Sequence, residues 1–293
     1  MSTRVPAWSL AVAAMLSVQL GAAYSTNLFA SVGPAGTSWL RLTMGALIFL
    51  AIKRPTLRGV GRHDLVVVFA LGVATGLLTT AFLNAVDRIP LGTAVAIEFL
   101  GPLGVAVVRS HDRRSLVWPA LALLGVLLLT EPWQGEIDLV GVGFAALSGV
   151  CWATYIVLTQ QVGDRFTGLE GLSITIPVAA VTAAFFGVPQ AWGNLTWQVL
   201  AAALGLALLL PVIPFSLELL ALRRLTTAAF GTLMALEPAI GVVAGVAILG
   251  QVPHALQVAG VVLVVAAGVG AERNGHRDDG AGDHEPPMPL GTA

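Results

Sequence analysis

The chain has 293 residues, of which 56% are hydrophobic and 11% are charged, and its formal net charge is −1. A soluble globular protein carries about 25% charged residues, so this composition excludes an ordinary soluble protein and indicates a membrane protein. The one cysteine, Cys151, stands in an apolar run, which excludes a disulfide framework within the chain.

Ten apolar segments follow one another, each close to the length of about 20 residues that a membrane-spanning helix needs. They cover residues 8–29, 34–53, 65–86, 91–108, 115–131, 139–160, 169–190, 198–222, 226–249 and 254–271. Residues 272–293 are polar and lack periodicity, so we expect a disordered tail there. The sequence therefore predicts an all-α polytopic membrane protein with ten transmembrane helices.

The basic residues set the expected orientation. With the N-terminus inside, the inside loops hold most of the 15 Lys and Arg residues: Arg4, Lys53, Arg54, Arg58, Arg62, Arg109, Arg113, Arg114, Arg165, Arg223, Arg224, Arg273 and Arg277. The outside holds only Arg88, and Arg41 lies within the second segment. Because cytoplasmic loops carry the excess of basic residues, we expect both termini in the cytoplasm and the chain in the plasma (inner) membrane.

The two halves of the chain, residues 1–131 and 139–271, carry matching residues in the same order. The matches are Gly92, Thr93, Ala96 and Glu98 with Gly231, Thr232, Ala235 and Glu237; Ser17, Ala22 and Tyr24 with Ser148, Ala153 and Tyr155; and Gly125 and Val126 with Gly268 and Val269. A unit of five crossings is odd, so the second copy enters from the opposite side. This predicts two inverted five-helix repeats, an architecture of secondary transporters that bind substrate between the repeats.

Glu98 and Glu237 are the main candidate site residues. A carboxylate within a transmembrane helix costs roughly 2.5–3.5 kcal/mol on the mildest insertion scale, and such residues usually mark substrate or proton pathways. We therefore expect the pair to bind a substrate amine, a proton or both. The alternative is a structural carboxylate, hydrogen-bonded to backbone groups that Pro102 or Pro238 leaves free.

Arg41 is the one basic residue expected inside a span, and three interpretations stay open for it. It can pair with a carboxylate, hold a substrate carboxyl group, or extend its head to the outer interface. Gln19, Tyr24, Asn84 and Tyr155 are further polar candidates for the site, or simply bond a neighbouring helix. Trp152 and Trp39 either line a cavity or pack between helices, and Glu218 is expected in an interfacial ion pair.

Glycine and proline patterns predict how the helices pack. Gly72 and Gly76, and likewise Gly241 and Gly245, are spaced four residues apart, a small-residue pattern that lets helices approach closely. Pro211 and Pro214 are expected to break the eighth helix, either to shape the bundle or to bind ligand.

Features of enzymes are missing from the expected spans. All five histidines, His63, His111, His254, His276 and His284, fall in expected loops or in the tail. No metalloprotease, serine hydrolase or nucleotide-binding motif occurs. We therefore expect no enzyme, no cofactor and no metal site.

Two long motifs resemble those of a transporter family. Pro90-Leu91-Gly92-Thr93-Ala94-Val95-Ala96-Ile97-Glu98-Phe99-Leu100-Gly101-Pro102 is similar to the fourth helix of bacterial threonine/homoserine exporters. Pro214-Phe215-Ser216-Leu217-Glu218 and Phe230-Gly231-Thr232-Leu233-Met234-Ala235-Leu236-Glu237-Pro238-Ala239 are similar to their second half. The resemblance covers about residues 8–271 and places the chain in the EamA-type branch of the drug/metabolite transporter superfamily.

The resemblance implies a secondary exporter of small amino acids, coupled to protons, with alternating access around a cavity lined by helices 1, 2, 4, 6, 7 and 9. The expected partners are a small-molecule substrate, protons and the lipid bilayer, without nucleic acid, and the oligomeric state is left open. The alternatives are export of another metabolite or drug, and a membrane scaffold or sensor without transport.

Overall fold

The computed structural model describes residues 6–52, 61–109, 116–131, 133, 138–163, 169–222 and 233–279, and this part of the chain is helical without any strand. Its helices are α1 (Ala7–Ser25), η1 (Thr26–Leu28), α2 (Phe29–Ile52), α3 (Arg62–Val86), α4 (Leu91–Glu98), α5 (Leu100–Arg109), α6 (Val117–Thr130), α7 (Leu139–Gly163), α8 (Leu169–Ala191), α9 (Trp197–Ala207), η3 (Leu208–Val212), α10 (Ile213–Leu222), α12 (Glu237–Leu249) and α13 (Ala255–Asp279). The all-helical prediction is confirmed for these residues.

Five stretches of the described chain are long and apolar enough to cross a membrane: Trp8–Ile52, Arg62–Val86, Leu139–Thr159, Gly171–Ala191 and Trp197–Glu218. Four shorter apolar helices accompany them: Leu91–Val105, Val117–Thr130, Glu237–Leu249 and Ala255–Gly270. The sequence pattern predicts ten segments of similar length. In the described residues α1 and α2 form one nearly continuous stretch, and the number of ten crossings stays a prediction.

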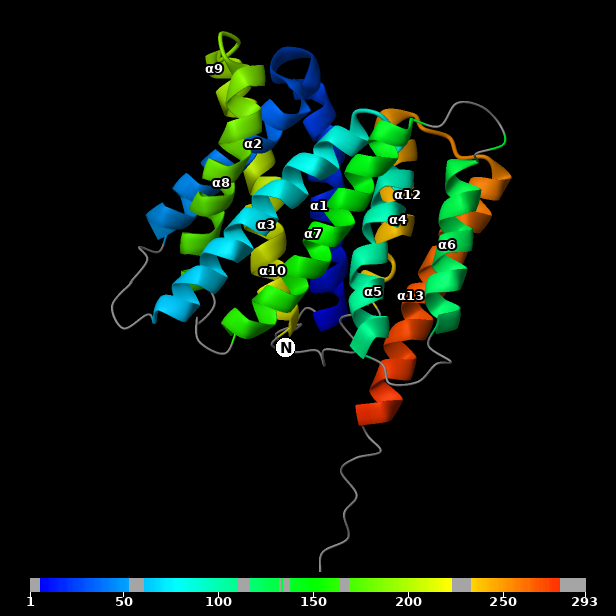
Figure 1. Ribbon diagram of the computed structural model, residues 1–293. Helices are drawn as coiled ribbons and strands as arrows, with labels where there is room; N and C mark the ends of the chain where they lie inside the picture. The colour runs from blue at the N-terminus through cyan, green and yellow to red at the C-terminus, as the bar shows by residue number, and fades with distance from the viewer. Residues whose placement is uncertain are drawn as a thin grey trace, which may run out of the picture.

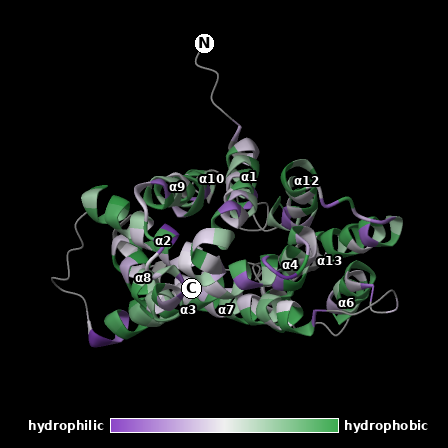
Figure 2. Cartoon of the chain, turned by 90° about the horizontal axis from the view of Figure 1, so that it is seen from above, coloured by the Kyte–Doolittle hydropathy of each residue, from purple (hydrophilic) through white to green (hydrophobic). Residues whose placement is uncertain are grey.

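The helices form one bundle with two long sides. Seen from above, α9, α10, α1 and α12 follow one side, and α8, α3, α7 and α6 follow the other (Figure 2). Large apolar side chains are exposed on the outer helices and on α13, for example Phe185 of α8, Val243 of α12 and Val262 of α13. Such exposure fits a bundle surrounded by lipid, where apolar side chains face outward.

The two described ends of the chain lie at the same end of the bundle. The first turn of α1 and the last turns of α13 point the same way in Figure 1. The connections 87–90, 192–196 and 250–254 lie at the opposite end, and Arg88 is the only basic residue in them. α13 continues to Asp279, past residue 272 where the sequence predicts the start of a disordered tail. Residues 280–293 lie outside the described part of the chain.

α2 contains a break that matches the predicted start of the second segment. Gly33 has φ 69° and ψ 167°, a backbone conformation that favours glycine. The side-chain oxygen of Gln190 in α8 accepts hydrogen bonds from the backbone N–H groups of Ala35 (2.9 Å) and Gly36 (3.3 Å). Gln190 thus satisfies donors that a new helix leaves free at its start.

The predicted break in the eighth segment lies between α9 and α10. Leu210 is extended (φ −159°, ψ 116°) next to Pro211, and Pro214 follows in α10. A side chain added at Gly21 of α1 would lie 3.3 Å from Leu210, so this break packs closely against α1. The hydroxyl of Ser17 donates to the carbonyl oxygen of Leu209 at 2.7 Å. The break is therefore part of the helix packing.

Glycines bring several helices into backbone contact. A Cβ added at Gly72 or Gly76 would lie 2.5–2.6 Å from atoms of α8, which confirms the predicted packing role. Gly241 packs against Val95 of α4 in the same way. Gly125 of α6 faces Gly260 of α13, whereas Gly268 faces Phe99 and Ala235. Gly125 and Gly268 thus both stand at close helix contacts, with different neighbours, and the repeat that their match predicts stays a prediction.

Candidate functional site

Glu98 stands where the fourth segment divides into α4 and α5. Pro102 cannot donate to the carbonyl of Glu98 four residues earlier, so the helix turns at Phe99. Gly149 of α7 lets its backbone approach Glu98 directly, since an added Cβ would lie 2.9 Å from the Glu98 carbonyl oxygen. The preceding residue of α7, Ser148, donates a hydrogen bond to the Glu98 carboxylate. The carboxylate is thus bonded to a side chain and is 7% exposed.

Glu237 begins α12, with Pro238 in the first turn of that helix. It is 4% exposed, and its side chain bonds that of Gln19 from α1. Its carboxylate also interacts electrostatically with Glu98. One of its carboxylate oxygens, Oε2, has no hydrogen-bond partner among the described residues. α12 packs against both α1 and α4, which brings the two predicted carboxylates to the same region of the bundle.

Arg41 lies inside the bundle and is 1% exposed. Its Nη1 donates to the Ser25 hydroxyl at 3.3 Å, while its Nε has no partner among the described residues. Its guanidinium interacts electrostatically with Glu98. The interpretation that Arg41 extends its head to the outer interface is wrong, because the whole side chain is enclosed by helices.

Glu218 and Tyr155 extend the polar cluster. Glu218 of α10 interacts electrostatically with Glu237 and with Tyr155 of α7. Tyr155 also packs against the buried residues Val67, Val68 and Leu71 of α3. The sequence suggests an interfacial ion pair for Glu218 with Arg223 or Arg224, but both arginines lie outside the described residues.

The remaining predicted residues have separate environments. Trp152 packs edge-to-face on Phe99, with ring centroids 6.4 Å apart, directly after the Glu98 turn. Asn84 donates to the carbonyl of Thr80 one turn earlier at 2.7 Å, a local contact within α3. Tyr24 is 45% exposed and stands apart from the buried cluster. Trp39 packs between α2 and α8 against Gly187.

Ser25 and Ser148 are site residues that sequence reasoning did not select. Ser148 is noticed in the sequence only as a repeat match, although it donates to Glu98 and stands 3.1 Å from the carbonyl oxygen of Leu78. Ser25 has no signal of its own, because a lone serine in an apolar helix usually bonds its own backbone. Ser25 does so at 2.6 Å to Gly21 and also accepts the bond from Arg41.

The cluster therefore places one guanidinium and three carboxyl groups inside an apolar bundle. Burying unpaired charge is costly, so such groups persist in membranes mainly where they bind ions, protons or substrates. Groups of both signs can hold a small zwitterion or exchange protons.

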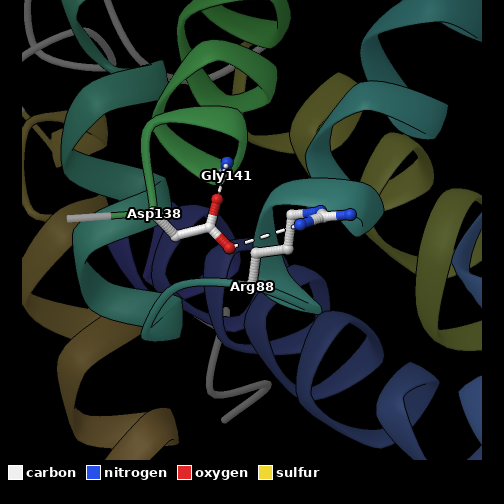
Figure 3. A network of polar contacts seen from close by, with 3 residues as sticks. All are labelled: Arg88, Asp138 and Gly141. Carbon is white, nitrogen blue, oxygen red and sulfur yellow. Dashed lines mark hydrogen bonds and ion pairs between the residues drawn. The ribbon is translucent and has the colours of Figure 1, made fainter. Parts of the chain in front are cut away.

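A second polar contact joins the first and second halves of the chain at the end of the bundle. Arg88, which follows α3, lies 3.3 Å from the carboxylate of Asp138, which precedes α7 (Figure 3). The other Asp138 oxygen accepts the backbone N–H of Gly141 at 2.8 Å and so caps α7. The Gly141 N–H and, more weakly, Arg88 lower the pKa of Asp138.

Comparisons with known proteins give relatives along almost the whole chain. The model of the "EamA-like transporter family" matches residues 139–270. The threonine/homoserine exporter RhtA of Escherichia coli K12 is 35% identical over 274 residues, covering 92% of this chain and 92% of that protein. RhtA of Salmonella typhimurium LT2 is 35% identical over 277 residues, covering 92% of this chain and 94% of that protein.

The chain is also similar to a more distant relative and, in its fold, to a solved structure. The pseudopaline exporter CntI of Pseudomonas aeruginosa PAO1 is 24% identical over 274 residues, covering 90% of this chain and 95% of that protein. One crystal structure has the same fold with a TM-score of 0.59 at 18% identity, covering 90% of this chain and 97% of the other. These relatives are named as exporters rather than enzymes. The chain is a multi-pass membrane protein and belongs to the EamA-like transporter family.

Proposed function

We propose that the chain is a secondary active exporter of small zwitterionic amino acids, such as threonine or homoserine, driven by the proton gradient. The observation that carries this proposal is the buried cluster, in which Arg41 and two carboxylates from matching motifs interact electrostatically inside the bundle. The named activity of relatives 35% identical over 92% of the chain supports the same substrate class.

The charges of the cluster suit a zwitterion. An amino acid presents a carboxylate and an ammonium group, so its site needs a cation and an anion. The Nε donor of Arg41 has no partner among the described residues, and the side chain offers the planar fork that binds carboxylates. Glu98 and Glu237 offer the opposite charge. A cationic or an apolar substrate would leave either Arg41 or the carboxylates without a counterpart.

Proton coupling rests on the same carboxylates. Inside an apolar bundle the protonated form of a carboxyl group costs less free energy than the ionised form. Such groups therefore take up protons readily and serve as proton carriers in transporters. Glu237 interacts electrostatically with both Glu98 and Glu218, so the protonation of Glu237 affects the protonation of each of them. In this proposal Tyr155 and Trp152 flank the site. The contacts of Asn84 and Tyr24 give no support for a role of either residue in substrate or proton binding.

Alternating access by two inverted repeats, residues 1–131 and 139–271, completes the proposal. Two hydrogen bonds support the repeat: Ser17 donates to the carbonyl of Leu209, and Ser148 donates to the carbonyl of Leu78. Ser148 lies 131 residues after Ser17, and Leu209 lies 131 residues after Leu78, so the two hydrogen bonds correspond to each other under one offset. The same-side ends of α1 and α13 fit an even number of crossings. The stretch Trp8–Ile52, 45 residues long, is interrupted at Gly33 and supports two crossings rather than one.

A second candidate is export of another metabolite by the same mechanism. The similarity to a pseudopaline exporter over 90% of the chain favours it, because that relative shares the fold but carries a different substrate by name. The two candidates differ only in the ligand that the buried cluster accepts.

Transport by purified protein in vesicles tests the proposal. A panel of labelled amino acids is loaded on the side of higher pH, and a proton gradient is applied. We expect gradient-dependent movement of threonine and homoserine, and none of a dicarboxylic acid or a sugar. Movement of other metabolites but of no amino acid in the panel would contradict the proposed substrate class.

A further inference from the structure

The two repeat carboxylates differ in how well they are satisfied. The Glu98 carboxylate accepts a hydrogen bond from Ser148 and faces Arg41 electrostatically. Glu237 Oε2 and Gln19 Oε1 have no donor among the described residues, although the two side chains are only 4% and 2% exposed. Buried acceptors without donors are rare and costly, so this pair is the unusual feature of the cluster.

The two free acceptors lie next to each other on neighbouring helices. Gln19 bonds Glu237 directly, and α1 packs against α12 (Figure 2). Gly241, one helical turn after Glu237, lies beside the Gln19 oxygen, which would be in ordinary contact with an added Cβ at 3.5 Å. The pair thus presents two acceptor oxygens, one of them from a carboxyl group, at one place.

We propose that Gln19 and Glu237 form the subsite for the ammonium group of the exported amino acid, and that this subsite selects substrates by their number of N–H donors. The inference rests on the proposed function and adds to it the division of labour between the two carboxylates. A primary ammonium carries three donors and satisfies both oxygens. Glu98 has its own donor and is not part of this subsite.

A series of N-methylated threonines tests the count of donors. Protonated threonine, N-methyl-, N,N-dimethyl- and N,N,N-trimethyl-threonine carry three, two, one and no N–H donors. Two acceptors need two donors, so wild-type protein should lose affinity mainly between the N-methyl and N,N-dimethyl compounds. Leaving one buried acceptor unsatisfied corresponds to about a tenfold loss or more. Each compound is measured as a competitor of labelled threonine exchange in vesicles.

The variant Gln19→Met removes one acceptor at nearly constant side-chain size. The main loss of affinity should then fall between the N,N-dimethyl and N,N,N-trimethyl compounds, because one N–H donor is enough for Glu237. Gln257→Met is the matched control, since Gln257 bonds the backbone of His254 at the exposed start of α13. It should keep the wild-type pattern.

Four outcomes distinguish support for the subsite from its failure and from failure of the proposed function. A shift of the step in Gln19→Met alone supports the subsite. A gradual loss that is the same in wild type and in Gln19→Met reflects size only and overturns the subsite while the amino-acid exporter stands. If Gln19→Met does not insert, a wild-type series without a step after the N-methyl compound also overturns the subsite. Absence of threonine exchange by the wild type overturns the proposed function itself.

Discussion

At the scale of a single residue, Arg41 is the side chain that the proposed site assigns to the substrate carboxylate. It is buried, it donates to Ser25, and its Nε has no partner in the part of the chain that the structure describes. Lysine carries the same charge but has no planar fork and no donor at the Nε position. The side chain can therefore be tested for geometry separately from charge.

We predict that Arg41→Lys weakens threonine transport by about tenfold or more, because a charge-assisted hydrogen bond to the substrate carboxylate is lost. The measurement is the concentration dependence of exchange by protein that is normally inserted. Arg88→Lys, the same change at a partly exposed arginine, is the control and should have little effect. Unchanged transport by Arg41→Lys would remove Arg41 from the substrate site.

At the scale of a single element, the start of α7 depends on Asp138. Its carboxylate caps the helix through Gly141 and pairs with Arg88 (Figure 3). Both partners lower the pKa of Asp138 from its ordinary 3.8, so folding is favoured wherever the group is ionised. This contribution is complete above the ordinary pKa and is lost only as the pH falls through the lower, folded value. It is therefore constant from pH 5 to pH 8.

We predict that Asp138→Ala speeds hydrogen exchange in the first turn of α7, whereas Asp138→Asn changes it little. Asparagine still accepts from Gly141, and an exposed ion pair contributes little by itself. Arg88→Ala, which removes the pair and keeps the cap, should resemble Asp138→Asn. Equal exchange in Asp138→Ala and Asp138→Asn would show that the cap does not hold the start of α7. For all variants the pattern should be unchanged between pH 5 and pH 8.

At the scale of the whole molecule, the account requires the loops to alternate between two sides of the membrane. The positions around Arg58, Arg113 and Arg223 lie outside the described residues, and their cytoplasmic location is a prediction from basic residues. In a Cys151→Ala background, Arg58→Cys and Trp133→Cys should react with an impermeant reagent from opposite sides. Reaction of both from one side would contradict the ten-crossing arrangement.

Charged residues inside the helices can be identified from the sequence, whereas the contacts between helices cannot. Glu98, Glu237 and Arg41 are recognisable because charge inside an apolar segment is expensive, and the structure places all three in one cluster. Tyr24 is a counter-example, because it lies five residues after Gln19, roughly 140° around the helix, and faces outward. The contacts of Ser148 with Glu98 and of Gln19 with Glu237 depend on long-range packing, which no local pattern encodes.

The central claim is that the buried cluster is both the transport site and the coupling site. The most direct test compares gradient-driven transport with exchange at equal, saturating threonine for Glu98→Gln and Glu237→Gln. Glutamine keeps the size and accepts hydrogen bonds but cannot carry the driving proton. Glu131→Gln, the same substitution at the end of α6, serves as the control.

We predict that at least one of the two cluster variants loses gradient-driven transport while saturating exchange continues, and that Glu131→Gln keeps both. Saturating substrate ensures that a weaker amine contact does not mask the difference. Full gradient-driven transport by both Glu98→Gln and Glu237→Gln would contradict the account, because neither carboxylate would then carry the proton.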